Sequence, residues 1–288
     1  MLHVGTDEAG YGPLLGPLVI GAAMHEYDGP RDSLALPGSG ESKDLYSRGG
    51  RNALARGLAP YLDADLLLPG PLHLGALLGR LSVRQDPRAA YDWYGEVEDA
   101  TATPAAQPEG FRGLLVNPIC EREFNAECGE LGGKGHLLFK ETMRLVREAL
   151  ERHPHADAEV VCDKHGGRNR YAALLLTELG PSTLVAECEG PVASRYRLTL
   201  GGRKLRVRFE AKADGHDPLA GLASMIAKYV RELFMEGLNA YFRPARRRTA
   251  THGGLHHRRA ALSRRPRGAP AGVRRARQRN PATYLGCV

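Results

Sequence analysis

The sequence predicts an α/β domain with a mixed central sheet flanked by helices. Short apolar, β-branched runs alternate along the chain with longer segments of helical periodicity, in the proportion typical of a layered α/β domain. Strands are predicted near residues 2–7, 18–24, 159–163, 184–188, 195–200 and 203–210, and helices near 51–62, 72–82, 136–152, 168–179 and 218–240. With 288 residues, the chain can bury one substantial core, or one domain with a small appendage.

The first two strands flank a glycine-rich turn, GTDEAGYGPLLGP at residues 5–17, which places Asp7 and Glu8 at a strand end. Alternation along a strand puts adjacent side chains on opposite faces, but we expect the glycines at 10 and 12 to break the strand between the two acids. Glycines also allow the backbone amides of Gly10, Tyr11 and Gly12 to approach a sugar or phosphate closely. This is the outline of a metal and phosphate site.

The next elements are structural. A helix over 51–62 carries Leu54, Leu58 and Leu62 on one stripe, which indicates core packing. The segment from about 84 to 118 is polar and rich in proline and alanine around the single tryptophan, so we expect an insertion that leaves the domain as a mobile loop.

Two more carboxylates follow predicted strands. EVVCD ends in Asp163, and EAKADGHDP places Asp214 just before a helix with Asp217 as N-cap and Pro218 in its first turn. Each acid alone is explained as a solvated strand-end or capping carboxylate, whereas their joint occurrence favours a metal site. Hard oxygen ligands select Mg²⁺ or Mn²⁺, and two such ions about 3.5 to 4 Å apart support in-line phosphodiester cleavage. The chain has no zinc-type His/Cys spacing and no nucleophile-elbow sequence.

These motifs together resemble the type 2 ribonucleases H (ribonuclease HII). The first motif matches at Asp7, Glu8, Ala9, Gly10, Gly12, Pro13, Gly16 and Pro17, with Tyr11 where the family has Arg. Asp163 and the Lys-Ala-Asp of residues 212–214, followed by a helix containing Ile-Ala-Lys, occur in the family's order, although the spacing is longer. The chain is similar to a divergent member of this family over most of residues 1–242.

The resemblance implies a ribonuclease H-like fold and a catalytic site in which Asp7, Glu8, Asp163 and Asp214 bind two Mg²⁺ or Mn²⁺ ions. It implies endonucleolytic cleavage of the RNA strand of an RNA–DNA hybrid, or of ribonucleotides embedded in duplex DNA, leaving 5′-phosphate and 3′-hydroxyl ends. The backbone of Gly10, Tyr11 and Gly12 would read the ribose 2′-hydroxyl group. In ESKDLYS, which resembles a further family stretch, Lys43 would lie near a substrate phosphate.

Other candidate contacts come from the residues themselves. The hairpin of residues 195–210 has a Gly-Gly turn and one basic face, so Arg206 and Arg208 either contact backbone phosphates or form an ordinary solvated face. The family lacks so long a segment here. His165, two residues after Asp163, either positions substrate and moves a proton or is a surface histidine. The glycine-rich stretch around Lys134 fails the phosphate-loop pattern and is predicted to be a turn before a helix.

Three alternative functions remain at this stage. One is a metal nuclease of the same fold that acts on another nucleic acid, which Tyr11 and the hairpin permit. The second is a nucleic-acid-binding protein with a degenerate site, which the four intact acids disfavour. The third is a nucleotide hydrolase that uses the loop around Lys134, for which we expect no nucleotide binding.

The charge distribution divides the chain. The formal net charge is +7, but residues 243–288 contain 13 arginines and no lysine or acid, so the remainder has 27 basic against 33 acidic residues, a net charge of −6. Residues 243–288 fit either a disordered basic tail that binds nucleic acid or the product of a reading-frame error. We favour the second because the composition changes sharply at Arg243, and we expect the segment to be dispensable for folding.

The five cysteines form no CxxC pair and their number is odd, which is typical of a reduced, cytoplasmic protein. No apolar run reaches about 18 residues, and the chain enters its first strand without a basic leader, so we expect no membrane association. The expected assembly is a monomer, with RNA–DNA hybrid or ribonucleotide-containing duplex as its partner.

Overall fold

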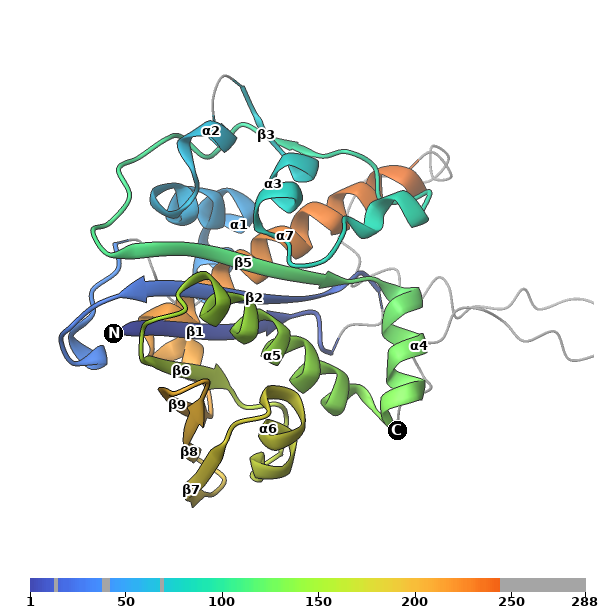
Figure 1. Ribbon diagram of the computed structural model, residues 1–288. Helices are drawn as coiled ribbons and strands as arrows, with labels where there is room; N and C mark the ends of the chain where they lie inside the picture. The colour runs from blue at the N-terminus through green and yellow to red at the C-terminus, as the bar shows by residue number, and fades with distance from the viewer. Residues whose placement is uncertain (13–14, 38–41, 68–69, 244–288) are drawn as a thin grey trace, which may run out of the picture.

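The computed structural model describes residues 1–12, 15–37, 42–67 and 70–243 (Figure 1). Its main strands are β1 (Leu2–Ala9), β2 (Leu18–Glu26), β5 (Phe111–Ile119), β6 (Ala158–Asp163), β7 (Thr183–Glu189), β8 (Ala193–Leu200) and β9 (Arg203–Glu210). Its helices are α1 (Ser42–Leu58), α2 (Ala64–Leu67), α3 (Leu74–Leu81), α4 (Glu121–Leu131), α5 (Lys134–Arg152), α6 (Ala172–Leu179) and α7 (Pro218–Phe242). Two short strands, β3 (Leu72–His73) and β4 (Glu98–Asp99), pair separately.

The seven main strands form one mixed sheet in the order β5-β2-β1-β6-β9-β8-β7. β5, β2 and β1 are antiparallel, whereas β6 runs parallel to β1 and β9 runs parallel to β6. The carboxyl ends of β1, β6 and β9 therefore lie side by side, along the edge of the sheet that is formed by strand ends. The predicted α/β fold with a mixed central sheet and flanking helices is confirmed.

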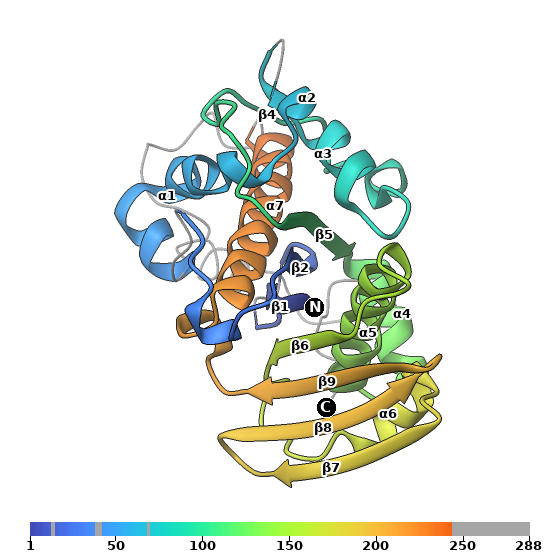
Figure 2. The ribbon, with the colours of Figure 1, turned by 60° about the vertical axis from the view of Figure 1, so that its left-hand side comes forward.

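The two faces of the sheet bury separate apolar clusters. α7 and α1 lie on one side of the sheet, and α4, α5 and α6 lie on the other (Figure 2). Alternation assigns the residues of each strand to one of these clusters: Leu2 and Val4 of β1 pack in the cluster of α5, as do Val160 and Cys162 of β6. Val161 instead contacts Ala220 of α7.

α7 lies unusually close to the sheet because two glycines face it. A Cβ atom at Gly5 of β1 would lie 2.2 Å from the carbonyl carbon of Leu219, and one at Gly21 of β2 would lie 2.3 Å from the carbonyl oxygen of Ala223. Backbone atoms of the helix occupy the space that any other side chain would need. Because Gly5 and Gly21 have no side chains, the backbone of α7 can lie directly against β1 and β2.

The segment 84–118 is not the mobile excursion that its composition predicts. Its residues 111–118 form all but the last residue of β5, an edge strand of the main sheet, and Tyr91 and Tyr94 are buried against the core. Pro118 is accommodated because β5 lies at the edge, where a missing backbone N–H costs little. Helix α4 was also not predicted.

The predicted hairpin of residues 195–210 is confirmed as β8 and β9. Gly201 and Gly202 both have positive φ angles, +56° and +81°, as a two-residue type I′ turn requires. β7 adds a further antiparallel strand at the sheet edge. The arginine-rich segment beyond Arg243 lies outside the described residues. No helix in the described part of the chain is long and apolar enough to span a membrane.

Candidate active site

The register of β1 and β6 brings Asp7 and Asp163 together. Thr6 pairs with Cys162 in the parallel ladder, so Asp7 and Asp163 are the next residues on two neighbouring strands. Asp7 accepts a hydrogen bond from Ser224 of α7, and Val161, two residues before Asp163, also faces that helix. Both carboxylates therefore lie on the α7 face, at the carboxyl ends of their strands.

Asp214 reaches the same edge from a short 3-10 turn, Ala213–Gly215, that follows β9. Lys212 has a left-handed conformation, φ +58°, which turns the chain back toward Asp163. The Oδ1 atom of Asp163 accepts a hydrogen bond of 2.9 Å from the amide of Ala213, next to Asp214. Lys43 comes from α1, and its Nζ lies 3.8 Å from Oδ2 of Asp214.

Glu8 differs from its predicted position. The strand does not break after Asp7: β1 continues to Ala9, and Glu8 pairs with Ile20 of β2, so Asp7 and Glu8 lie on opposite faces. The reason is that β2 continues to pair with β1 up to Ala9, while pairing with β6 stops at Thr6. Glu8 thus projects beyond the end of β6, where its charge still interacts with those of the other acids.

The pKa values of three of these carboxyl groups report the crowding. The pKa of Asp7 is raised to about 7, first by burial and then by the charges of Asp163 and Asp214, against the opposing hydrogen bond from Ser224. Burial raises the pKa of Glu8 well above its ordinary value, followed by the charges of the other three acids. The pKa of Asp163 is also raised, first by burial. A cation between the acids would relieve these costs.

Within the described residues, no three carboxylate, imidazole or thiol groups are close enough to form a ready-made ion cluster. The charges of these acids nevertheless raise the pKa values of Asp7, Glu8 and Asp163. These two observations concern different ranges, since charges interact over several ångströms while ligand atoms must lie about 2.0 to 2.6 Å from an ion. The donor set, which consists of carboxylate oxygens alone, fits Mg²⁺ or Mn²⁺.

Ser224 is a candidate site residue that the sequence analysis did not identify. Its hydrogen bond lowers the pKa of Asp7, and its Oγ lies 2.8 Å from the Oγ of Ser42 at the start of α1. Both serines are buried, so the contact links Asp7 through α7 to the helix that carries Lys43. The only sequence signal was a serine within the apolar run LAGLASMIA, which could have indicated a polar group facing the sheet.

Two cationic side chains lie near Tyr11. Nζ of Lys134, the first residue of α5, lies 4.7 Å from the centre of the Tyr11 ring. A Cβ atom at Gly135 would lie 3.8 Å from the Tyr11 hydroxyl and 3.7 Å from a guanidinium nitrogen of Arg168. Burial, followed by the charge of Glu8, raises the pKa of Tyr11, which places its hydroxyl in the field of the acids. The glycine-rich turn therefore has positive charge beside it although it lacks the family arginine.

His165 does not lie where a substrate contact requires. The side chain is buried between the rings of Phe139, Tyr171 and Phe209, and burial lowers its pKa to about 3. A neutral imidazole packed among aromatic rings serves the core on the α5 side. The expectation that His165 positions substrate or moves a proton is not supported, because the chain turns away from the α7 face after Asp163.

The other predicted contacts lie on the α7 face of the sheet. Arg206 is exposed on β9, and the guanidinium of Arg208 lies 3.4 Å from Glu159 and 3.7 Å from Glu210. Glu210 is the register partner of Asp163. The basic face of the hairpin is thus continuous with the edge of the sheet that holds the acids.

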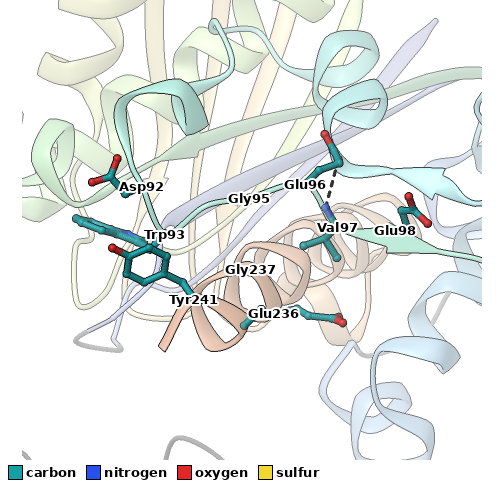
Figure 3. A pocket seen from close by; sticks show the side chains of 10 residues that line it. Asp92, Trp93, Gly95, Glu96, Val97, Glu98, Glu236, Gly237 and Tyr241 are labelled. Carbon is teal, nitrogen blue, oxygen red and sulfur yellow. Dashed lines mark hydrogen bonds between the residues drawn. The ribbon is translucent and has the colours of Figure 1, made fainter. Parts of the chain in front are cut away.

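A separate pocket lies at the far end of α7 and contains none of the four acids (Figure 3). Its lining is acidic and aromatic: Asp92, Trp93, Gly95, Glu96, Val97, Glu98, Glu236, Gly237, Ala240 and Tyr241.

No protein-family model matches this sequence, and no curated protein matches it. Several solved structures are similar. Ribonuclease H2 from Pyrococcus horikoshii OT3 is 17% identical, with 84% of this chain and 77% of that chain covered and a TM-score of 0.40. A mutant of Bst-RNase HIII is 14% identical, with 83% of this chain and 54% of that chain covered and a TM-score of 0.40. In the PCNA:RNase HII complex from Archaeoglobus fulgidus, the matched chain is 19% identical, with coverages of 83% and 76% and a TM-score of 0.37.

Proposed function

We propose that this protein is a metal-dependent endoribonuclease that cleaves the RNA strand of RNA–DNA hybrids, or ribonucleotides embedded in duplex DNA. The observation that carries the proposal is the convergence of Asp7, Glu8, Asp163 and Asp214 at one sheet edge, where burial and the neighbouring negative charges raise the pKa values of Asp7, Glu8 and Asp163. Keeping several carboxylates together at the end of a rigid sheet is costly, and the cost is removed when divalent cations bind.

Two Mg²⁺ or Mn²⁺ ions, when bound, would supply an activated water and stabilise the leaving oxygen in a phosphodiester hydrolysis that gives 5′-phosphate and 3′-hydroxyl ends. Asp7 and Asp163, side by side on β1 and β6, and Asp214 would hold them from the α7 side. Glu8 would approach from the other face. Ser224 fixes the orientation of Asp7, and Lys43, which is 78% exposed, is free to contact a phosphate beside Asp214.

Recognition of ribose would depend on the glycine-rich turn. Gly10 has φ +97°, and a Cβ atom there would lie 2.5 Å from the carbonyl oxygen of Pro17, so only glycine fits. No atom of the described residues lies within 4 Å of a Cβ built at Gly12, which leaves the turn open on that side as far as those residues extend. Backbone amides in this turn can reach a 2′-hydroxyl group, the feature that distinguishes RNA from DNA. Lys134, held over Tyr11, would supply the cation next to it.

We further propose that the enzyme acts as a monomer in the cytoplasm. Cys120, Cys162 and Cys188 are free thiols, which suits a reducing compartment.

The decisive experiment compares three labelled duplexes of equal length: all-DNA, DNA with one ribonucleotide, and a full RNA–DNA hybrid, each with Mg²⁺ or Mn²⁺. Cleavage at ribonucleotides alone, absent in EDTA and in Asp163→Asn, supports the proposal. Equal cleavage of the all-DNA duplex would instead identify a nuclease of broader specificity. Binding without cleavage of any duplex would identify a degenerate, nucleic-acid-binding site.

A further inference from the structure

The hairpin of β8 and β9 presents five basic side chains on one face of the sheet. We call this the arginine face; it consists of Arg195, Arg197, Lys204, Arg206 and Arg208. The alternate residues of both strands, among them Tyr196, Val207 and Phe209, are buried in the cluster on the α5 side. Alternation therefore directs all five cations to the α7 side of the sheet, the side on which Asp7 and Asp163 lie.

The strand register places like charges directly opposite each other twice in succession. Arg195 pairs with Arg208, and Arg197 pairs with Arg206. Directly opposed like charges destabilise a β-ladder, so an ordinary solvated face would be expected to alternate cations with acids. This arrangement costs free energy in the isolated protein and costs less when an anionic partner lies across both strands.

The acids nearby neutralise only part of the arginine face. Arg197 lies 2.5 Å from Glu187, Arg195 lies 3.9 Å from Glu210, and Arg208 shares Glu159 and Glu210. For Lys204 and Arg206, no carboxylate lies within ion-pair distance in the described part of the chain. Two exposed cations are therefore free to bind phosphate groups.

The distance between the arginine face and the acids is a few base pairs of a duplex. Glu210 is the register partner of Asp163, and Arg206 lies four residues before it on β9. At about 3.3 Å per residue, Arg206 lies about 13 Å from the acids and Lys204 about 20 Å. With about 3.4 Å of helix axis per nucleotide, this distance corresponds to roughly four to six base pairs.

We propose that the arginine face is a binding surface for the phosphate backbone of a nucleic-acid duplex, and that it holds the duplex on one side of the cleavage position. The inference rests on the proposed function for its cleavage position but not for the binding itself. Lys204 and Arg206 make the unneutralised contacts, and Arg195, Arg197 and Arg208 add charge between them and the acids.

The test measures binding of a 20-base-pair all-DNA duplex by fluorescence anisotropy between 50 and 200 mM salt. This duplex reports phosphate contacts whether or not the protein cleaves ribonucleotides. The test variant is the full chain with Lys204→Gln and Arg206→Gln. The control variant carries Arg112→Gln and Arg152→Gln, which removes two exposed cations from β5 at the opposite sheet edge and from the end of α5. All proteins keep the 13 arginines of residues 243–288, so any contribution from that segment is the same.

We expect the test variant to bind more weakly and its logarithmic salt dependence to be shallower by about two, because each lost phosphate contact removes about 0.9 from the slope. The affinity ratio of wild type to test variant should then shrink about tenfold over this fourfold range of salt. The control should keep the wild-type slope. The melting temperature of the test variant should be unchanged or higher, since Arg197 no longer faces a second cation across the ladder.

An unchanged slope in the test variant, or an equal loss in the control, would overturn the inference while leaving the nuclease proposal intact. Failure of the wild-type protein to bind the duplex would overturn it too, as would competition by polyglutamate as effective as that by DNA of equal charge. Conversely, the wild-type protein could fail to cleave ribonucleotides while the test variant still shows a shallower salt dependence of binding. That result would support the binding surface and would exclude only the proposed reaction.

Discussion

Asp7→Asn should remove the part of the pH dependence of stability that Asp7 contributes in the metal-free protein. The pKa of Asp7 is about 7 in the folded state against an ordinary value of 3.8. The folded state therefore holds this proton more tightly than the unfolded state. The protonated carboxyl group contributes its full stabilisation of the folded state below about pH 4, and this contribution is lost as the pH rises through 7. At 1.36 kcal/mol for each pKa unit, the carboxylate costs roughly 4 kcal/mol at pH 8. Asparagine preserves the shape and can still accept the hydrogen bond from Ser224.

The assay is urea unfolding in EDTA, followed by the fluorescence of Trp93, the only tryptophan. The free energy of unfolding of Asp7→Asn should exceed that of the wild type, and the difference should widen by roughly 2 to 3 kcal/mol between pH 5 and pH 8. Mg²⁺ added at pH 8 should stabilise the wild type more than the variant. Parallel pH curves for the two proteins would refute the reasoning, because they would mean that Asp7 is neither buried nor crowded.

Three further outcomes are expected. Asp163→Asn should abolish metal-dependent cleavage while its melting temperature holds or rises, since a charge leaves a crowded cluster; cleavage at the wild-type rate would reassign the site. Ser224→Ala should lower kcat about tenfold or more and move the acidic limb of the pH–rate profile upward, because the hydrogen bond that lowers the pKa of Asp7 is lost; an unshifted profile would contradict this. Lys134→Ala should raise KM several-fold with little change in kcat, whereas Lys134→Arg should retain binding since a guanidinium also lies well over a tyrosine ring; equal defects in the two variants would exclude the cation's role.

Elements with a clear period could be predicted from the sequence. The alternation in RKLRVRFE and the Gly-Gly turn gave the β8–β9 hairpin, and Asp217 with Pro218 gave the start of α7, where the Asp217 side chain accepts a hydrogen bond from Ala220. β5 was missed because most of FRGLLVNPI is buried between α3 and α5, so it shows no alternation and contains a proline. α4 was missed because only Phe124 and Cys128 of its eleven residues are buried.

The candidate site likewise contains residues that the sequence indicates and residues that it does not. Asp7, Asp163 and Asp214 could be proposed as site residues because strand ends and a helix start are visible in the sequence, and the structure brings them to the same end of the sheet. Ser224 and Lys134 contact the site from α7 and α5, more than 100 residues away along the chain from Asp7, and no local pattern indicates such contacts. His165 shows the opposite error: its closeness to Asp163 along the chain suggested a role, whereas the turn after β6 carries it into the core.

The contact of α7 with Gly5 and Gly21 limits which amino-acid substitutions the protein can accept near the site. Ser224, which orients Asp7, lies on the same stretch of α7 that rests on these two strands. A single methyl group at position 5 would have to displace the helix backbone, and with it the serine, so an alteration two residues from Asp7 would disturb the carboxylate without touching it. The positions of α7, β1 and β2 around the site therefore cannot shift by small steps. New substrate preferences would have to arise in the glycine-rich turn, at the start of α5 or on the β8–β9 hairpin, where side chains can be exchanged while α7 and the two strands stay in place.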